Sequence, residues 1–298
     1  MINNKLQNKL KKKQFVFTAE TSPPDSTDKS DITKRVSCLR NLADGVNVTD
    51  GASAKSHLSS LVVSSIIQNF GLDAILQLTT RDRNRIAIQS DLLGAWALNI
   101  KNILCIYGDQ VKTGDQPDAK EVRDLDTIGI AQTAHNFKTN KMFPSGRIVR
   151  SAPEFFIGGA DTPFKIDDTF DCQNLIKKID SGVNFFQTQY AFDIDILKNY
   201  MNRLSDYGIP EKSFYLVGLG VIKSAKSARW MNKNLFGIDI PEHIVKRIEK
   251  SDNEEEEGKT ICKELIEQYK EINGVHGIHL MGYHQEEQIA EVISHFKN

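Results

Sequence analysis

The sequence is poor in features that mark several common protein classes. Its 298 residues include four cysteines and no CxxC pair, so we expect reduced thiols rather than a disulfide framework. Positive and negative charges nearly cancel, at 38 Lys and Arg against 39 Asp and Glu, which disfavours nucleic acid or an anionic membrane as a partner. No apolar run approaches the roughly 18 residues of a membrane span. We therefore expect a soluble, cytoplasmic protein that acts on a small ligand.

Several motifs of enzyme chemistry are also missing. The absence of a GxSxG elbow and a GxxxxGK[ST] loop disfavours a hydrolase of that type and a P-loop nucleotide enzyme. The turn after the first predicted strand, TSPPDS, lacks the glycines of a dinucleotide-binding turn. His276 and His279 form an HxxH pair, but positions i and i+3 of a strand face opposite sides, so we expect no metal site there.

Hydrophobic periodicity instead predicts alternating strands and helices. The predicted strands cover residues 15–20, 46–49, 74–78, 103–107, 147–151, 184–189, 214–219 and 277–281. The predicted helices cover 28–42, 54–70, 84–98, 125–137, 172–180, 194–207, 225–249, 256–272 and 286–296. Eight strand–helix units predict a single-domain α/β protein, a closed (β/α)8 TIM barrel over residues 15–298, after a polar extension at 1–14. An open doubly wound sheet is the alternative.

The site of such a barrel lies at the carboxyl ends of its strands, and these ends are polar here. In strand 1, Glu20 shares a face with Thr18, so it points inward if Phe17, on the other face, meets the covering helices. The other polar strand ends are Thr49-Asp50, Gln77, Gly108-Asp109, Pro153-Glu154, and Gln187 with Gln189.

Gln187 and Gln189 share a parity, so both should point into the lumen and need hydrogen-bonding partners. A polar heterocycle would satisfy them; two satisfied core amides are the alternative. The polar loop 109–126 follows strand 4 and is a candidate substrate-covering loop.

The order of several segments resembles the methylenetetrahydrofolate reductase family, flavin-dependent barrels of one-carbon metabolism. These segments are FTAETSPP, VNVTDG, QLTTRDRNR, NILCIYGDQ, RSAPEFF, DSGVNFFQTQYAFD and VGLGVIKSAKSARWM. The resemblance runs from about Phe15 to the C-terminus and covers a catalytic barrel only. It implies that FAD passes a hydride to or from the one-carbon unit of tetrahydrofolate, interconverting the 5,10-methylene and 5-methyl forms. A folate-binding barrel that acts as a non-redox subunit or methyl-transfer partner is the alternative.

The resemblance also implies roles for individual residues. Glu20 matches the family's general acid, which assists opening of the five-membered ring at N10, and Asp109 matches an aspartate between flavin and pterin. Gln189 matches a glutamine that binds folate, and we assign Gln187 to the substrate with it. The flavin contacts that we expect are Thr49, Gln77, Tyr107, Gly108, Asp109, Asp171 and Lys178.

Some positions depart from the family pattern. Members that use a reduced nicotinamide often carry His, Arg and His where this chain has Gln77, Tyr107 and Phe156, and a ligand-stacking Phe aligns with Ala225. We therefore expect NAD(P)H to be a poor electron donor, or another donor to replace it, unless Phe156, Tyr190 or Tyr283 supplies the stacking ring. We also expect a homo-oligomer, as relatives commonly form, and reduction would feed methionine biosynthesis.

Overall fold

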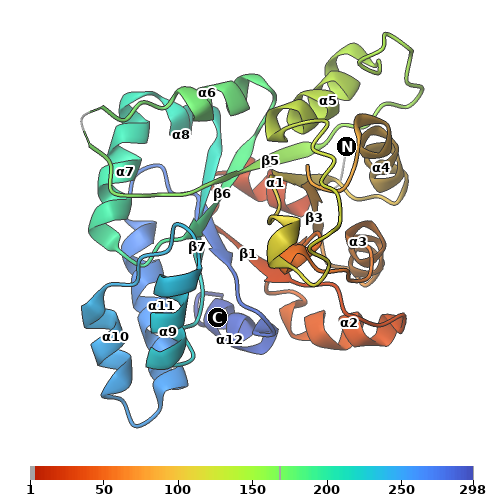
Figure 1. Ribbon diagram of the computed structural model, residues 1–298. Helices are drawn as coiled ribbons and strands as arrows, with labels where there is room; N and C mark the ends of the chain where they lie inside the picture. The colour runs from red at the N-terminus through yellow and green to blue at the C-terminus, as the bar shows by residue number, and fades with distance from the viewer. Residues whose placement is uncertain (1–3, 168, 298) are drawn as a thin grey trace.

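The protein folds as a closed barrel of eight parallel strands that follow one another in chain order, as the computed structural model of residues 4–167 and 169–297 shows (Figure 1). The strands are β1 (Val16–Thr21), β2 (Gly45–Val48), β3 (Ala74–Thr79), β4 (Asn102–Ile106), β5 (Phe156–Asp161), β6 (Phe185–Tyr190), β7 (Phe214–Leu219) and β8 (Gly277–Leu280). β8 pairs with β1 and closes the sheet. The predicted (β/α)8 barrel is confirmed.

Most of the helices ring the barrel and connect successive strands, whereas the first precedes β1 and the last follows β8 (Figure 1). They are α1 (Lys5–Lys11), α2 (Lys29–Val36), α3 (Ser60–Asn69), α4 (Arg85–Ala97), α5 (Thr127–Asn140), α6 (Gln173–Asp180), α7 (Ile194–Asp206), α8 (Ile209–Lys212), α9 (Ala225–Asn234), α10 (Glu242–Glu249), α11 (Glu254–Lys270) and α12 (Glu286–His295), with single 3-10 turns at Ser37–Leu39, Ala52–Ala54 and Val111–Thr113. Within the described ranges, none combines the length and apolar character that crossing a bilayer requires.

Side-chain caps explain why several predicted helices begin where they do. Asp28, Asn84, Asp126 and Asp193 each precede a helix and accept a hydrogen bond from an N–H group of its first turn. The predicted helix 225–249 is instead two helices, α9 and α10, because the intervening loop takes a left-handed turn at Gly237, with φ of +72°.

The fifth strand lies later in the chain than predicted. The expected strand at 147–151 is wrong, and β5 is FIGGAD, whose two glycines weaken its intrinsic β-propensity. Packing overrides that propensity, because a Cβ atom at Gly158 would lie 2.5 Å from the Phe185 ring and 2.8 Å from Leu104. Ile148 instead pairs with Met142 in an isolated antiparallel bridge and is 73% exposed.

The new register corrects two further expectations. The end of strand 5 is Asp161, not the Pro153-Glu154 pair. Phe156 pairs with Asn102, the first residue of β4, so it lies at the amino end of the barrel, where its ring stacks on Phe185 at 4.8 Å. It therefore cannot supply a stacking ring at the opposite end, where we expect the site.

An apolar layer closes the amino end of the barrel interior. Val16, Ile75, Leu104, Phe156, Phe185 and Leu216 form it together with Leu6 and Leu10. The two leucines come from α1, so part of the segment expected to be a polar extension packs under the strands. The alternation predicted for β1 is confirmed, since Phe17 stacks on Phe296 of the helical shell while Thr18 meets His279 inside.

Candidate active site

A ladder of polar side chains crosses the interior above the apolar layer. The Gln187 amide donates to Thr18 Oγ1 and to Asn47 Oδ1, both at 3.0 Å, and Asn47 Nδ2 donates to Gln187 Oε1 at 2.6 Å. His279 Nδ1 lies 3.0 Å from Thr18 Oγ1. All four side chains are buried. Gln187 is thus satisfied by core partners, the alternative that its parity left open.

Glu20 lies one step nearer the carboxyl end than this ladder, at the mouth of the barrel. Its side chain is 23% exposed, and its Oε2 accepts a hydrogen bond from Gln77 Nε2 at 3.1 Å. His279 Nε2 lies 3.9 Å from the same oxygen. One carboxylate oxygen therefore accepts a hydrogen bond from Gln77 and faces His279, and the group remains accessible to a ligand in the mouth.

A cavity of about 320 Å³ adjoins Glu20 through Gln77, within the roughly 300–1,000 Å³ usual for small-molecule sites. It is lined by Thr49, Asp50, Ala52, Gln77, Ile106, Tyr107, Gly108 and Asp109. The structure thus brings together five of the seven residues that we expected to contact a cofactor. Gly108 has φ of +81°, and a Cβ atom there would lie 3.0 Å from Thr79, so this turn needs glycine.

Thr49 leaves a polar atom unsatisfied in this cavity wall. Its Oγ1 is buried and has no hydrogen-bond partner among the residues that the structure describes. Such an orphaned group costs about 1–3 kcal/mol unless a ligand or water pairs with it. The wall is therefore suited to a ligand that carries a hydrogen-bonding group.

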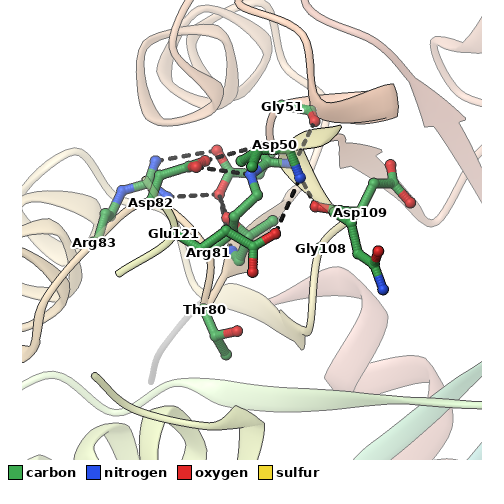
Figure 2. Close-up of polar contacts among 12 residues, drawn as sticks. Asp50, Gly51, Thr80, Arg81, Asp82, Arg83, Gly108, Asp109 and Glu121 are labelled. Carbon is green, nitrogen blue, oxygen red and sulfur yellow. Dashed lines mark hydrogen bonds and ion pairs between the residues drawn. The ribbon is translucent and has the colours of Figure 1, made fainter. Parts of the chain in front are cut away.

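Asp50 lines the cavity and links the end of β2 to the end of β3, and it pairs with Arg83 (Figure 2). It accepts two hydrogen bonds from Arg83, at 2.7 and 3.0 Å, two from Thr79 and one from Ser60. Burial by itself would raise the pKa of Asp50, but the hydrogen bonds and charge of Arg83, with those of Thr79 and Ser60, lower it below its ordinary value. Asp50 is therefore an ionised structural group.

Asp109 follows β4 on the rim of the cavity. Arg81 donates to the carbonyls of Gly51 and Asp109, at 3.2 Å each, and so fixes both rim turns (Figure 2). The carboxylate of Asp109 extends away from Arg81, is exposed, and accepts the Ser53 N–H at 2.8 Å. An exposed carboxylate on a fixed backbone can face a cationic part of a ligand.

The loop 109–126 folds back onto the strand ends. The Arg123 guanidinium lies 3.7 Å from the centre of the Tyr107 ring and donates to the Tyr107 carbonyl at 2.9 Å. The Val122 N–H donates to the Arg81 carbonyl at 2.7 Å. These contacts hold the predicted covering loop beside the cavity and leave Tyr107 57% exposed.

The remaining predicted residues lie outside the cavity lining. A register shift between Gln187 and Tyr190 separates Gln189 from the ladder, and its amide donates weakly to the Phe236 carbonyl, at 3.4 Å. Lys178 donates to the Ala160 carbonyl near the end of β5, and burial lowers its pKa although Asp161 opposes the shift. Asp171 is exposed, and its Oδ1 accepts the N–H of Gln173, the first residue of α6, at 3.1 Å.

Of the three rings proposed to stack on a nicotinamide in place of the Phe that aligns with Ala225, two lie near the mouth. Ala225 is buried at the start of α9, and Phe156 lies at the other end of the barrel. Tyr190 ends β6 partly buried, and Tyr283 follows β8 with 75% of its surface exposed. In residues 4–167 and 169–297, no group of three or more His, Cys, Asp or Glu is placed to hold a metal ion.

Sequence reasoning missed His279 and Asn47, which order the interior of the site. Both lie on inward positions of predicted strands, so the parity argument used for Glu20 would have placed them inside. It also missed Arg81 and Arg123, whose contacts depend on loop conformations. No local pattern indicates those contacts.

A larger hollow, of about 540 Å³, opens at the opposite end of the barrel between α1, β1 and the end of α12. Lysine and phenylalanine side chains dominate its lining, and none of the polar strand ends reaches it. In this fold the reacting groups gather at the carboxyl ends of the strands. We therefore place the candidate site at the mouth that holds Glu20.

The family model "Methylenetetrahydrofolate reductase" matches residues 5–297. A Caenorhabditis elegans protein, "Probable methylenetetrahydrofolate reductase (NADPH)", is 23% identical over 98% of this chain, and a Schizosaccharomyces pombe protein, "Methylenetetrahydrofolate reductase 1", is 26% identical over 82%. The matches cover 44% and 39% of those two proteins, so the chain spans less than half the length of each. A Salmonella typhimurium protein, "5,10-methylenetetrahydrofolate reductase", is 24% identical over 72% of this chain and 67% of its own length.

Among solved structures, an uncharacterized Clostridium thermocellum protein that binds two copies of 5-methyl-5,6,7,8-tetrahydrofolic acid has a TM-score of 0.66 and 14% identity, with 98% of this chain and 99% of that one covered. An EDTA monooxygenase from a Chelativorans species has a TM-score of 0.57 and 7% identity, over 95% of this chain and 94% of its own. At these identities, the likeness shows the fold alone.

Proposed function

This chain belongs to the methylenetetrahydrofolate reductase family, and we propose that it interconverts 5,10-methylenetetrahydrofolate and 5-methyltetrahydrofolate with FAD as its cofactor. The observation that carries the proposal is Glu20, a partly exposed carboxylate at the mouth, hydrogen-bonded to a glutamine that lines the neighbouring cavity. The names of the relatives and the folate bound by the clostridial protein support a folate substrate.

The cavity fits part of a flavin nucleotide. The unpaired Thr49 hydroxyl offers a hydrogen bond, Gly108 allows close approach of the backbone, and Gln77 and Tyr107 complete the wall. Lys178 and Asp171 follow β5, the neighbour of β4 in the barrel, and would hold the rest of the cofactor. When bound, FAD would accept or return a hydride, and the protein residues would supply binding, orientation and proton transfer.

Glu20 would act as the general acid. Its Oε2 is engaged by Gln77, whereas no described residue donates to Oε1, which is thus available to a ligand. In the reducing direction, protonated Glu20 gives its proton to N10 as the carbon–N10 bond opens; in the oxidising direction, the carboxylate takes that proton back. General acid catalysis of this kind contributes typically about 10²–10⁴-fold to a rate.

Asp109 and Gln189 would hold the pterin end of the substrate. Opening of the five-membered ring leaves a cationic iminium, which the exposed Asp109 carboxylate would stabilise electrostatically. The Gln189 Oε1 accepts the Tyr190 N–H at 3.0 Å, whereas its Nε2 makes the long 3.4 Å contact with the Phe236 carbonyl, which it would exchange for a substrate hydrogen bond. Gln187 is fully hydrogen-bonded within the ladder. It would therefore affect the substrate indirectly, by orienting Thr18 and Asn47 beneath the mouth.

The assignment of the cofactor is tested by Thr49→Val, which removes the orphaned hydroxyl at nearly constant volume. We expect the free protein to be as stable as the wild type or more so, while the Kd for FAD rises about two- to tenfold, the value of one net hydrogen bond. The matched control is Ser64→Ala, because Ser64 Oγ is also buried and unpaired among the described residues but lies on α3, outside the cavity lining.

Fluorescence titration of apoprotein with FAD measures both variants. An unchanged Kd in Thr49→Val would remove Thr49 from the cofactor site. A wild-type protein that takes up no FAD would contradict the proposed function and favour a folate-binding subunit without redox turnover.

The electron donor and the cellular setting are part of the same proposal. We propose that the enzyme is cytoplasmic and homo-oligomeric, and that NADH or NADPH reduces its flavin slowly, because Ala225 carries no ring and Phe156 lies at the amino end of the barrel, so that stacking on a nicotinamide falls to Tyr190 or Tyr283 near the mouth. Another donor, such as a partner protein, would then serve when the enzyme works toward 5-methyltetrahydrofolate and methionine biosynthesis.

A further inference from the structure

We propose that His279 is a positioning residue that presents an Nε2–H group to Glu20, and that the polar ladder below it fixes this tautomer. The inference about catalysis rests on the proposed function of Glu20, whereas the tautomer depends only on the ladder. No metal role is needed for His279, since its partner in the HxxH pair, His276, lies before β8 and accepts the N–H of Tyr215.

The pairing with Asn47 sets the orientation of the Gln187 amide. Asn47 and Gln187 form a reciprocal pair in which each amide donates to the other, at 2.6 and 3.0 Å. In this arrangement the nitrogen of Gln187 faces Thr18 Oγ1, at 3.0 Å, and His279 Nδ1, at 3.3 Å. The amide nitrogen, which can only donate, and the Thr18 hydroxyl thus lie on the Nδ1 side of the imidazole ring; the other acceptor near that hydroxyl, the Ile278 carbonyl, is farther away, at 3.4 Å against 3.0 Å for Nδ1.

The donors on the Nδ1 side decide where the ring carries its proton. A neutral imidazole has one donor and one acceptor nitrogen, so an accepting Nδ1 leaves the hydrogen on Nε2. Nε2 faces Glu20 Oε2 at 3.9 Å. The opposite orientation of both amides would place a bare Nε2 lone pair against the Glu20 carboxylate, which is repulsive when that group is ionised.

The function of this N–H group follows from the two states of Glu20. A separation of 3.9 Å is longer than a hydrogen bond, so in this structure the contact orients the dipole toward the carboxylate without bonding it. When Glu20 has given up its proton, the charged carboxylate attracts the N–H group, and a small side-chain movement closes the gap. His279 would therefore stabilise the ionised state of Glu20 that proton transfer to N10 leaves behind.

Two substitutions separate this role from a structural one. The amide of His279→Gln can reach the place of Nε2 and keep a donor facing Glu20, whereas the shorter amide of His279→Asn reaches only the place of Nδ1 and keeps the ladder. We expect His279→Asn to slow the oxidation of the reduced flavin by 5,10-methylenetetrahydrofolate, the direction in which Glu20 gives up its proton, about 10- to 100-fold, the scale for a hydrogen bond to a charged group. His279→Gln should stay within about threefold of wild type.

Anaerobic stopped-flow absorbance measures these rates, and reduction by dithionite, which needs no proton transfer through Glu20, should be equal in all three proteins. Equal effects of the two substitutions on the folate reaction, or a larger effect of His279→Gln, would overturn the positioning role and leave His279 a support for Thr18 and Gln187.

The tautomer has a readout that requires no activity. In ¹⁵N-labelled protein without ligand, the His279 ring signals, identified by their loss in His279→Gln, should show a protonated Nε2 and an accepting Nδ1. A protonated Nδ1 would overturn the inference whatever the kinetics show. If the wild type has the Nε2–H tautomer but 5-methyltetrahydrofolate does not reduce its flavin, the proposed function and the positioning role both fail and only the tautomer stands.

Discussion

Replacing Asp50 with alanine removes the carboxylate that ties the carboxyl ends of β2 and β3. The side chain is 7% exposed and accepts five hydrogen bonds, two of them from Arg83. Removing one partner of a buried ion pair costs about 3–5 kcal/mol, because the other charge stays buried without compensation. Arg83 keeps a second partner, Asp91, at 2.8 Å, so we expect a loss of about 3 kcal/mol.

Urea denaturation followed by circular dichroism measures this loss, with Glu267→Ala as the control. Glu267 pairs with Lys270 at 3.1 Å, and both side chains are exposed, so its removal should cost about 0–1 kcal/mol. A difference of less than about 1 kcal/mol between the two variants would refute the view that Asp50 holds the cavity wall.

The lowered pKa of Asp50 predicts how its contribution to stability changes with pH. The pKa of Asp50 is lowered in the folded protein, so its charge contributes stability above the unfolded-state pKa of about 3.9, and that contribution is lost as the pH falls through the lower folded value. The advantage of wild type over Asp50→Asn should therefore be constant near neutrality and shrink below about pH 4. An advantage that grows on acidification would contradict the assignment.

Three further predictions concern the acid, the barrel interior and the electron donor. Glu20→Gln should keep FAD binding while the folate half-reaction slows by about 10²–10⁴-fold in stopped-flow experiments, and near-normal turnover would exclude Glu20 as the acid. Gly158→Ala should cost about 1–3 kcal/mol of unfolding free energy, because the new methyl group meets Phe185 and Leu104, whereas Gly94→Ala, whose nearest neighbour would be 3.7 Å away, should stabilise helix α4 by about 0.5–1 kcal/mol; equal effects would refute the packing argument. Reduction of the flavin by NADH should be slow and poorly saturable, and fast reduction at micromolar NADH would show that the loss of a ring at Ala225 is of no consequence.

The sequence predicts much of this fold because the local signals agree with the packing. Asn84 and Asp193 cap helices in which apolar residues recur at helical spacing, and the helices begin where the sequence indicates. The strand at 147–151 fails for the opposite reason, since Gly158 and Gly159 suit β5 only through contacts with Phe185 and Phe186, far along the chain. Such a position cannot be read from intrinsic propensity.

Some residues of the candidate site can likewise be predicted from the sequence, and others depend on contacts that form only in the folded chain. Strand parity places Glu20 inside, and the strand ends bring Thr49, Gln77 and Gly108 to one cavity. Parity fails to keep Gln189 with Gln187, because the register shift that separates them depends on the pairing of β6 with β7. The ties of the loop 109–126 to Arg81 and Tyr107 also arise only once the chain has folded.

The most direct test mixes FAD-loaded wild-type protein with 5-methyltetrahydrofolate in the absence of oxygen. The account predicts that the flavin absorbance near 450 nm bleaches to completion and that one equivalent of 5,10-methylenetetrahydrofolate forms for each flavin reduced. Flavin that stays oxidised in the presence of bound 5-methyltetrahydrofolate would contradict it, because the barrel would then bind the folate without exchanging a hydride.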